Sequence, residues 1–122
     1  MTNNSQEKIN LDLRKKISIE LCQSFTQRLD PNQTACVKSG AVIALKNFIK
    51  KSKIEDPIIY SFLVDTIVDP EKEVRDLVIK VIKEVVNSEI IELLEIKQKE
   101  ISGEMKAEIG NLLKVLRTKE KN

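Results

Sequence analysis

The chain has 122 residues, of which 41% are hydrophobic and 33% are charged, and its formal net charge is +2. This length suits one domain with a substantial buried core, and a net charge so close to zero does not by itself indicate a nucleic-acid-binding protein. The chain has two cysteines and no histidine, so the usual ligand set of a zinc site is missing, and no metal or cofactor is expected.

The sequence also bears on the cellular compartment. The segment that follows Met1 lacks the apolar stretch of a signal peptide, and no apolar run approaches the length of a membrane span. Cys22 and Cys36 are expected to be reduced, partly buried side chains, which is typical of a reducing compartment. We therefore expect a cytoplasmic protein without membrane association.

The first predicted element is a long helix from about residue 5 to residue 28, preceded by a flexible N-terminus at residues 1–4. Apolar side chains recur along it at a helical spacing. Its apolar face consists of Ile9, Leu11, Leu13, Ile17, Ile19, Leu21, Phe25 and Leu29. Its part at Ile9, Leu11, Leu13, Ile17 and Ile19 is wider than one neighbouring helix needs, so this part is a candidate surface for homo-oligomerisation.

Three aspartate–proline pairs mark the starts of the next three predicted helices. An aspartate carboxylate can accept a hydrogen bond from a free backbone N–H of the first turn, and proline fits the first helical position. The pairs are Asp30-Pro31, Asp56-Pro57 and Asp69-Pro70. The second helix is therefore predicted to run from residue 31 to about residue 50, the third from residue 57 and the fourth from residue 70.

The third and fourth helices have clear apolar faces. Spacings of three and four residues place the apolar side chains of each helix on one side. In the third helix these side chains are Ile58, Ile59, Phe62, Leu63 and Ile67, and in the fourth they are Val74, Leu77, Val78, Val81, Ile82, Val85 and Val86.

Two further helices complete the predicted all-α fold. Ile90, Ile91, Leu94 and Ile96 are the apolar residues of the fifth helix, and Met105, Ile109, Leu112, Leu113 and Leu116 are those of the sixth. Ser102-Gly103 separates the two helices. We expect the sixth helix to span about residues 104–117 and to be followed by a flexible tail at residues 118–122. Residues 5–117 would then form one domain of three helix pairs, at about 5–50, 54–87 and 88–117.

The fourth helix recurs in weaker form on both sides of itself. The segment from Val37 to Ile49 aligns with the segment from Val74 to Val86 at a spacing of 37 residues, and the segment that begins at Met105 aligns at a spacing of 31. Self-similarity at such spacings is typical of a helical repeat array.

Asp69, followed by Val74-Arg75 and an aliphatic helix, resembles the HEAT repeat, an armadillo-type helical repeat. The other copies depart from that pattern, because Asp30 lies eight residues before Lys38 and the third copy has Met105-Lys106 in place of the Val-Arg pair. The resemblance implies a right-handed α-α superhelix, a short HEAT-like solenoid of three antiparallel helix pairs. It also implies that the second helix of each pair lines a face that binds proteins or peptides.

One row of basic residues in this alignment is expected to be structural. Lys38, Arg75 and Lys106 occupy equivalent positions in the three copies. The resemblance implies that the basic residue at this position bonds to acids in the turns, here Asp30 or Asp69.

A second row of basic residues is the candidate partner-binding site. Lys46, Lys83 and Lys114 are equivalent in the alignment, and Lys80 lies on the same helix as Lys83. Adjacent packed helices lie roughly 8–10 Å apart, so the repeat would place these lysines on one face. Ordinary solvated surface lysines are the alternative explanation.

The sequence contains no arrangement typical of catalysis. Without histidine, a serine or cysteine nucleophile lacks its most frequent base. Glu71, Glu73 and Asp76 lie near a helix start and are explained as solvated charges. The glycines form no phosphate-binding motif, and Lys38 or Lys106 would need burial to become a reactive amine. We therefore expect the chain not to be an enzyme.

The function favoured by the sequence is a non-catalytic protein–protein interaction or scaffold module that docks an acidic partner on its lysine-lined face. One alternative is an accessory protein that binds the phosphate backbone of nucleic acid, and another is an oligomerising accessory subunit. The low net charge and the scarcity of aromatic residues for base stacking weigh against nucleic-acid binding.

Overall fold

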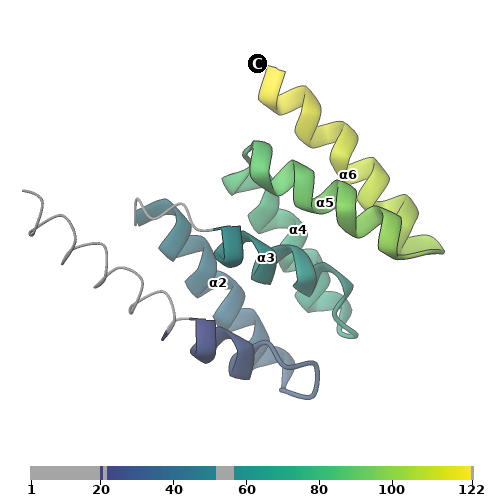
Figure 1. Cartoon of the computed structure of the whole chain (residues 1–122). Coiled ribbons are helices and arrows are strands. Elements are labelled where there is room, and N and C mark those ends of the chain that lie inside the picture. Colours follow the sequence, from purple (N-terminus) through teal and green to yellow (C-terminus); the bar gives the residue numbers. More distant parts are fainter. Residues whose placement is uncertain (1–19, 21, 52–56, 122) are drawn as a thin grey trace, which may run out of the picture.

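In a computed structural model of the chain, the structure describes residues 20, 22–51 and 57–121 (Figure 1). Residues 22–28 are helical, and the elements that follow are α2 (Ala35–Lys51), α3 (Pro57–Asp65), the 3₁₀ helix η1 (Thr66–Val68), α4 (Lys72–Val85), α5 (Ser88–Glu100) and α6 (Glu104–Lys121). These described residues form helices and turns without a strand, which confirms the all-α class.

Helices that are two apart in the chain pack side by side. α2 packs against α4, α3 packs against α5, and α5 also packs against α6 (Figure 1). The first two contacts therefore join helices that are not consecutive in the chain. α4 also contacts η1 and α3. No helix in this part of the chain is long and apolar enough to cross a membrane.

The core lies between these packed helices and consists almost entirely of aliphatic side chains. On α4, Val74, Val78, Val81 and Ile82 are buried, as their spacing predicts. The buried set also includes Ile90, Ile91 and Leu94 on α5, and Ile109, Leu112, Leu113 and Leu116 on α6. The apolar periodicity therefore identified the inward faces of these three helices.

The apolar face of α3 differs from its prediction. Ile58 is 53% exposed, whereas Tyr60 and Val64, which were not expected in the core, are buried. Ile59, Leu63 and Ile67 are buried as predicted. Within α3 (Pro57–Asp65), the buried pairs 59–60 and 63–64 replace the predicted pairs 58–59 and 62–63. The inward face is thus shifted by one residue, which corresponds to about 100° around the helix axis. Ile96 on α5 is also outside the core, at 54% exposed.

The start of α2 is a correction to the aspartate–proline prediction. Residues 31–33 form a turn, and the helix begins only at Ala35. The carboxylate of Asp30 accepts a hydrogen bond from the backbone N–H of Asn32 at 2.8 Å. The hydroxyl of Thr34 accepts a hydrogen bond from the N–H of Val37 at 3.3 Å, so Thr34 satisfies a first-turn donor instead.

The start of α4 is displaced in the same way. The helix begins at Lys72, two residues after Pro70, and Glu71 is its N-cap residue in an extended conformation. Asp69 lies before the cap and its carboxylate accepts a hydrogen bond from the N–H of Glu71 at 3.0 Å. By contrast, α3 begins at Pro57 as predicted.

The two C-terminal helices are separated as expected, but the last one is longer. Gly103 lies between α5 and α6 with a φ of 79°, a conformation that glycine adopts without steric cost. α6 continues to Lys121, so residues 118–121, expected as a flexible tail, are helical. The predictions for residues 1–19, including the expected flexible start and the oligomerisation surface, fall outside the described residues.

Candidate functional site

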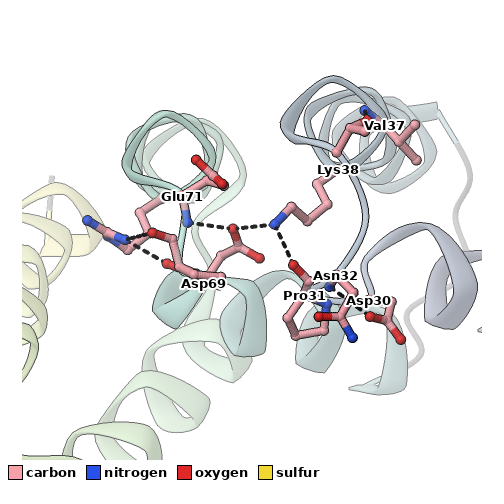
Figure 2. Close-up of polar contacts among 10 residues, drawn as sticks. Asp30, Pro31, Asn32, Val37, Lys38, Asp69 and Glu71 are labelled. Carbon is pink, nitrogen blue, oxygen red and sulfur yellow. Dashed lines mark hydrogen bonds and ion pairs between the residues drawn. The ribbon is translucent and has the colours of Figure 1, made fainter.

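The side chain of Lys38 is completely buried and links the turn before α2 to the turn before α4. Its ammonium lies 2.9 Å from Oδ2 of Asp69, and it donates a second hydrogen bond to the backbone carbonyl of Pro31 at 3.1 Å. Figure 2 shows Lys38 reaching from α2 to Asp69, whose carboxylate also accepts the N–H of Glu71. The turn before α2 and the turn before α4 are thereby held at the N-terminal end of α2.

The aligned basic residues take three different positions. Lys38 pairs with Asp69 rather than with Asp30, whose carboxylate caps its own turn. Arg75 donates through Nη1 to the carbonyls of Asp69 and Pro70, at 2.7 and 3.0 Å, rather than to a carboxylate. Lys106 is exposed. Because the amine of Lys38 is engaged by two acceptors, its burial does not make it a free nucleophile.

Three lysines lie around Glu84 of α4, and two of them, Lys46 and Lys80, are predicted partner-binding residues. Nζ of Lys46 lies 3.8 Å from Oε2 of Glu84, and Nζ of Lys50 lies 3.1 Å from the same oxygen. Lys80 lies one helical turn before Glu84. The hydrogen bond from Lys50 and the charges of Lys46, Lys50 and Lys80 hold the pKa of Glu84 below its ordinary value of 4.5. We call these four residues the Glu84 cluster.

Sequence reasoning missed two members of the Glu84 cluster. Neither Lys50 nor Glu84 was among the predicted partner-binding residues, which were Lys46, Lys80, Lys83 and Lys114. The two residues are 34 apart in the sequence, close to the repeat spacing, and this was the signal that could have paired them.

Lys83 belongs to a groove between α4 and α6 rather than to the Glu84 cluster. The groove has a volume of ≈ 270 Å³ and is lined by Asp76, Ile79, Lys83, Glu108, Asn111, Leu112 and Val115. Nζ of Lys119 also donates to the backbone carbonyl of Lys83 at 3.5 Å. α4 and α6 are therefore neighbours on this side of the molecule.

Lys114 does not line the groove. On α6 the groove is lined by Glu108, Asn111, Leu112 and Val115, so the residue after Lys114 lines it and Lys114 does not. One residue corresponds to a rotation of about 100° around an α-helix. Lys114 is exposed on α6.

These contacts show that α2, α4 and α6 run in the same direction. Lys38 approaches Asp69 near the start of α4, whereas Lys50 approaches Glu84 near its end, and Lys119 near the end of α6 contacts Lys83 near the end of α4. The C-terminal ends of the three helices therefore face the same way (Figure 1).

Basic residues concentrate toward these C-terminal ends. Lys50 and Lys51 lie in the last turn of α2, and Lys83 lies in the last turn of α4. Acids occupy the opposite ends, with Glu73 in the first turn of α4 and Glu104 in the first turn of α6. Each helix dipole favours this distribution, so lysines outnumber acids in the last turns of α2 and α4 taken together.

Among the described residues, no group of three or more cysteine, aspartate and glutamate side chains is arranged to hold a metal ion. Of the two cysteines, Cys36 is exposed and Cys22 is half-buried. Comparison of the chain with models of protein families, with curated proteins and with solved structures gives no match.

Proposed function

We propose that the chain is a non-catalytic protein-binding module built from HEAT-like helix pairs. The packing of α2 against α4, and of α3 against α5, supports this architecture. The buried bond between Lys38 and Asp69 also supports it, because it joins the turns of successive pairs in the way that the resemblance implies. Under this proposal, α2, α4 and α6 are the second helices, which carry the binding face.

The partner that suits this face is an acidic protein. The observation that carries the proposal is the gathering of lysines in the C-terminal halves of α2 and α4, where only Glu84 lies among Lys46, Lys50 and Lys80. A positive end of this kind raises the encounter rate with an acidic surface and disfavours basic ones. The expected contact region is thus the Glu84 cluster together with Lys83, in place of the predicted row of Lys46, Lys83 and Lys114. Lys114 lies at the margin of this region.

The experiment is affinity capture from a native cell extract followed by charge reversal. The folded variant with Lys46, Lys83 and Lys114 changed to Glu should lose the captured partner at low salt. A matched variant with Lys72, Lys99 and Lys106 changed to Glu, three other exposed lysines, carries the same net charge and should retain it. Equal retention by both variants would contradict the proposal.

The salt dependence separates a protein partner from nucleic acid. Phosphate-backbone binding weakens steeply and log-linearly as the salt concentration rises, because condensed counterions are released. Association with an acidic protein loses mainly its encounter-rate enhancement. Capture of nucleic acid with a steep salt slope would therefore favour the phosphate-binding alternative.

A further inference from the structure

Glu84 occupies the position that an acidic group of a partner would take. Its carboxylate oxygen Oε2 lies between the ammonium groups of Lys46 and Lys50, which come from α2, while Glu84 itself belongs to α4. The glutamate therefore bridges two neighbouring helices of the binding face. The positive charges of three lysines are directed at this one carboxylate.

We propose that Glu84 is an internal competitor, which an acidic side chain of the partner displaces from Lys46 and Lys50 when it docks. This inference rests on the proposed protein-binding function and adds a residue-level account of how the site is held before binding. Displacement would transfer Lys46 and Lys50 from an intramolecular carboxylate to an intermolecular one.

Because the Glu84 cluster is exposed, such an exchange costs little free energy. The side chains of Lys50 and Glu84 are 50% and 36% exposed, and exposed ion pairs contribute little because water solvates the separated charges. Glu84 can therefore leave its lysines without creating a buried charge. The pair of Lys38 and Asp69 offers a contrast, since neither side chain is more than 3% exposed and separation would leave both charges buried.

The local charge also favours a second anion. Three lysines face one glutamate in the Glu84 cluster, so the cluster remains positive when the internal pair is formed. Lys80 has no acid within ion-pair distance in the described part of the chain. An arriving carboxylate can contact Lys80 first and then exchange with Glu84.

The chemical class of the occupant is a carboxylate of an acidic peptide segment. The cluster already holds a carboxylate between lysines from one helix, at 3.1 and 3.8 Å, and an aspartate or glutamate of a partner has the same group. A nucleic-acid phosphate is the competing occupant, and the experiment below distinguishes the two.

A purely structural role for Glu84 predicts the opposite result from the proposed one. If Glu84 only ties α4 to α2, its removal weakens the fold and leaves anion binding unchanged. If it is a competitor, its removal increases anion binding. A gain of binding is informative because misfolding does not produce it.

The test is the variant Glu84→Gln with a fluorescein-labelled peptide of eight glutamates as the probe, followed by fluorescence anisotropy. The full chain carrying Glu84→Gln should bind the probe roughly two- to fivefold more tightly than the unmodified chain at low salt. The difference should shrink at high salt, where exposed charges are screened. Adding Lys50→Gln to Glu84→Gln should cancel most of the gain.

The matched control is Glu92→Gln, which removes one exposed glutamate from α5 and gives the same net charge. Its gain in affinity for the probe should be smaller than that of Glu84→Gln, because Glu92 lies on α5 and Lys46 and Lys50 are paired with Glu84 instead. An equal gain in Glu92→Gln and Glu84→Gln would overturn the proposal, since net charge alone would then explain it.

The remaining outcomes are also decisive. Binding of the probe by the unmodified chain without a gain in Glu84→Gln would overturn the competitor role and leave the acidic-partner function intact. Absence of probe binding in all variants would overturn both. A larger gain for a single-stranded oligothymidylate than for the peptide would overturn the choice of a carboxylate occupant.

Discussion

The ammonium of Lys38 lies 2.9 Å from the carboxylate of Asp69, and the two side chains are 0% and 3% exposed. The pair connects residues that are 31 apart in the sequence. Because Asp69 also accepts the N–H of Glu71, one carboxylate fixes both the preceding turn and the entry to α4. The position of α4 against α2 therefore depends on a polar contact as well as on aliphatic packing.

Replacing Lys38 with Met should destabilise the fold by about 3–5 kcal/mol, because Asp69 would keep a buried charge without its counterion. The measurement is urea denaturation at neutral pH. The control is Lys106→Met, at the aligned but exposed position, which should change the free energy of unfolding by no more than about 0.5 kcal/mol. Similar losses in the two variants would show that the pair does not stabilise the turns.

Ile82 and Lys80 provide a second comparison on a single helix. Ile82 is 0% exposed and Lys80 is exposed. Ile82→Ala should cost roughly 2–5 kcal/mol through lost burial and the remaining cavity, whereas Lys80→Ala should cost no more than about 0.5 kcal/mol. Chemical denaturation of both variants measures the difference, and the reverse ranking would mean that the inward face of α4 is wrongly assigned.

Two glycines should respond to alanine in opposite directions. An added Cβ at Gly40, inside α2, meets no atom within 4 Å, so Gly40→Ala should stabilise by about 0.4–1 kcal/mol by restricting the unfolded chain. Gly103 has a φ of 79°, where a Cβ costs roughly 1–2 kcal/mol. Thermal melts of both variants test this, and a Gly103→Ala variant as stable as the unmodified chain would contradict the assigned turn.

The aliphatic core was predictable because burial follows a periodicity that the sequence displays directly. Val74, Val78 and Ile82 repeat every four residues and are all 0% exposed. The helix starts were less predictable. An aspartate before a proline indicates a cap, but the carboxylate of Asp69 is used by Lys38, a residue of another helix. Local sequence does not contain that long-range contact.

The candidate site was predictable only in part, for a geometric reason. Alignment by residue type made Lys114 equivalent to Lys83, whereas Val115, the next residue of α6, is the one that lines the groove together with Lys83. A shift of one residue is invisible to a sequence comparison but rotates a side chain by about 100°. The association of Lys46 and Lys50 with Glu84 depends likewise on the separation of two helices, which residue types do not encode.

The titration of Glu84 gives a direct test of the cluster. Its pKa should lie below the ordinary value of 4.5, chiefly because of the hydrogen bond from Lys50 and then the charges of Lys46, Lys50 and Lys80. Since folding lowers this pKa, the ionised carboxylate stabilises the fold above pH 4.5, and the stabilisation is lost as the pH falls through the lowered pKa. NMR titration of the Glu84 side-chain carboxyl measures the value directly.

Lys50→Gln should raise the pKa of Glu84 toward 4.5, because it removes the largest cause of the lowering. Lys99→Gln, which removes an exposed lysine of α5, should leave the pKa of Glu84 nearly unchanged and serves as the control for net charge. High salt should reduce the difference between the unmodified chain and Lys50→Gln, since exposed charges are screened. An ordinary pKa for Glu84 in the unmodified chain would mean that the lysines of α2 do not pair with this carboxylate in solution. That result would contradict the competitor mechanism, which begins with Glu84 paired with Lys46 and Lys50.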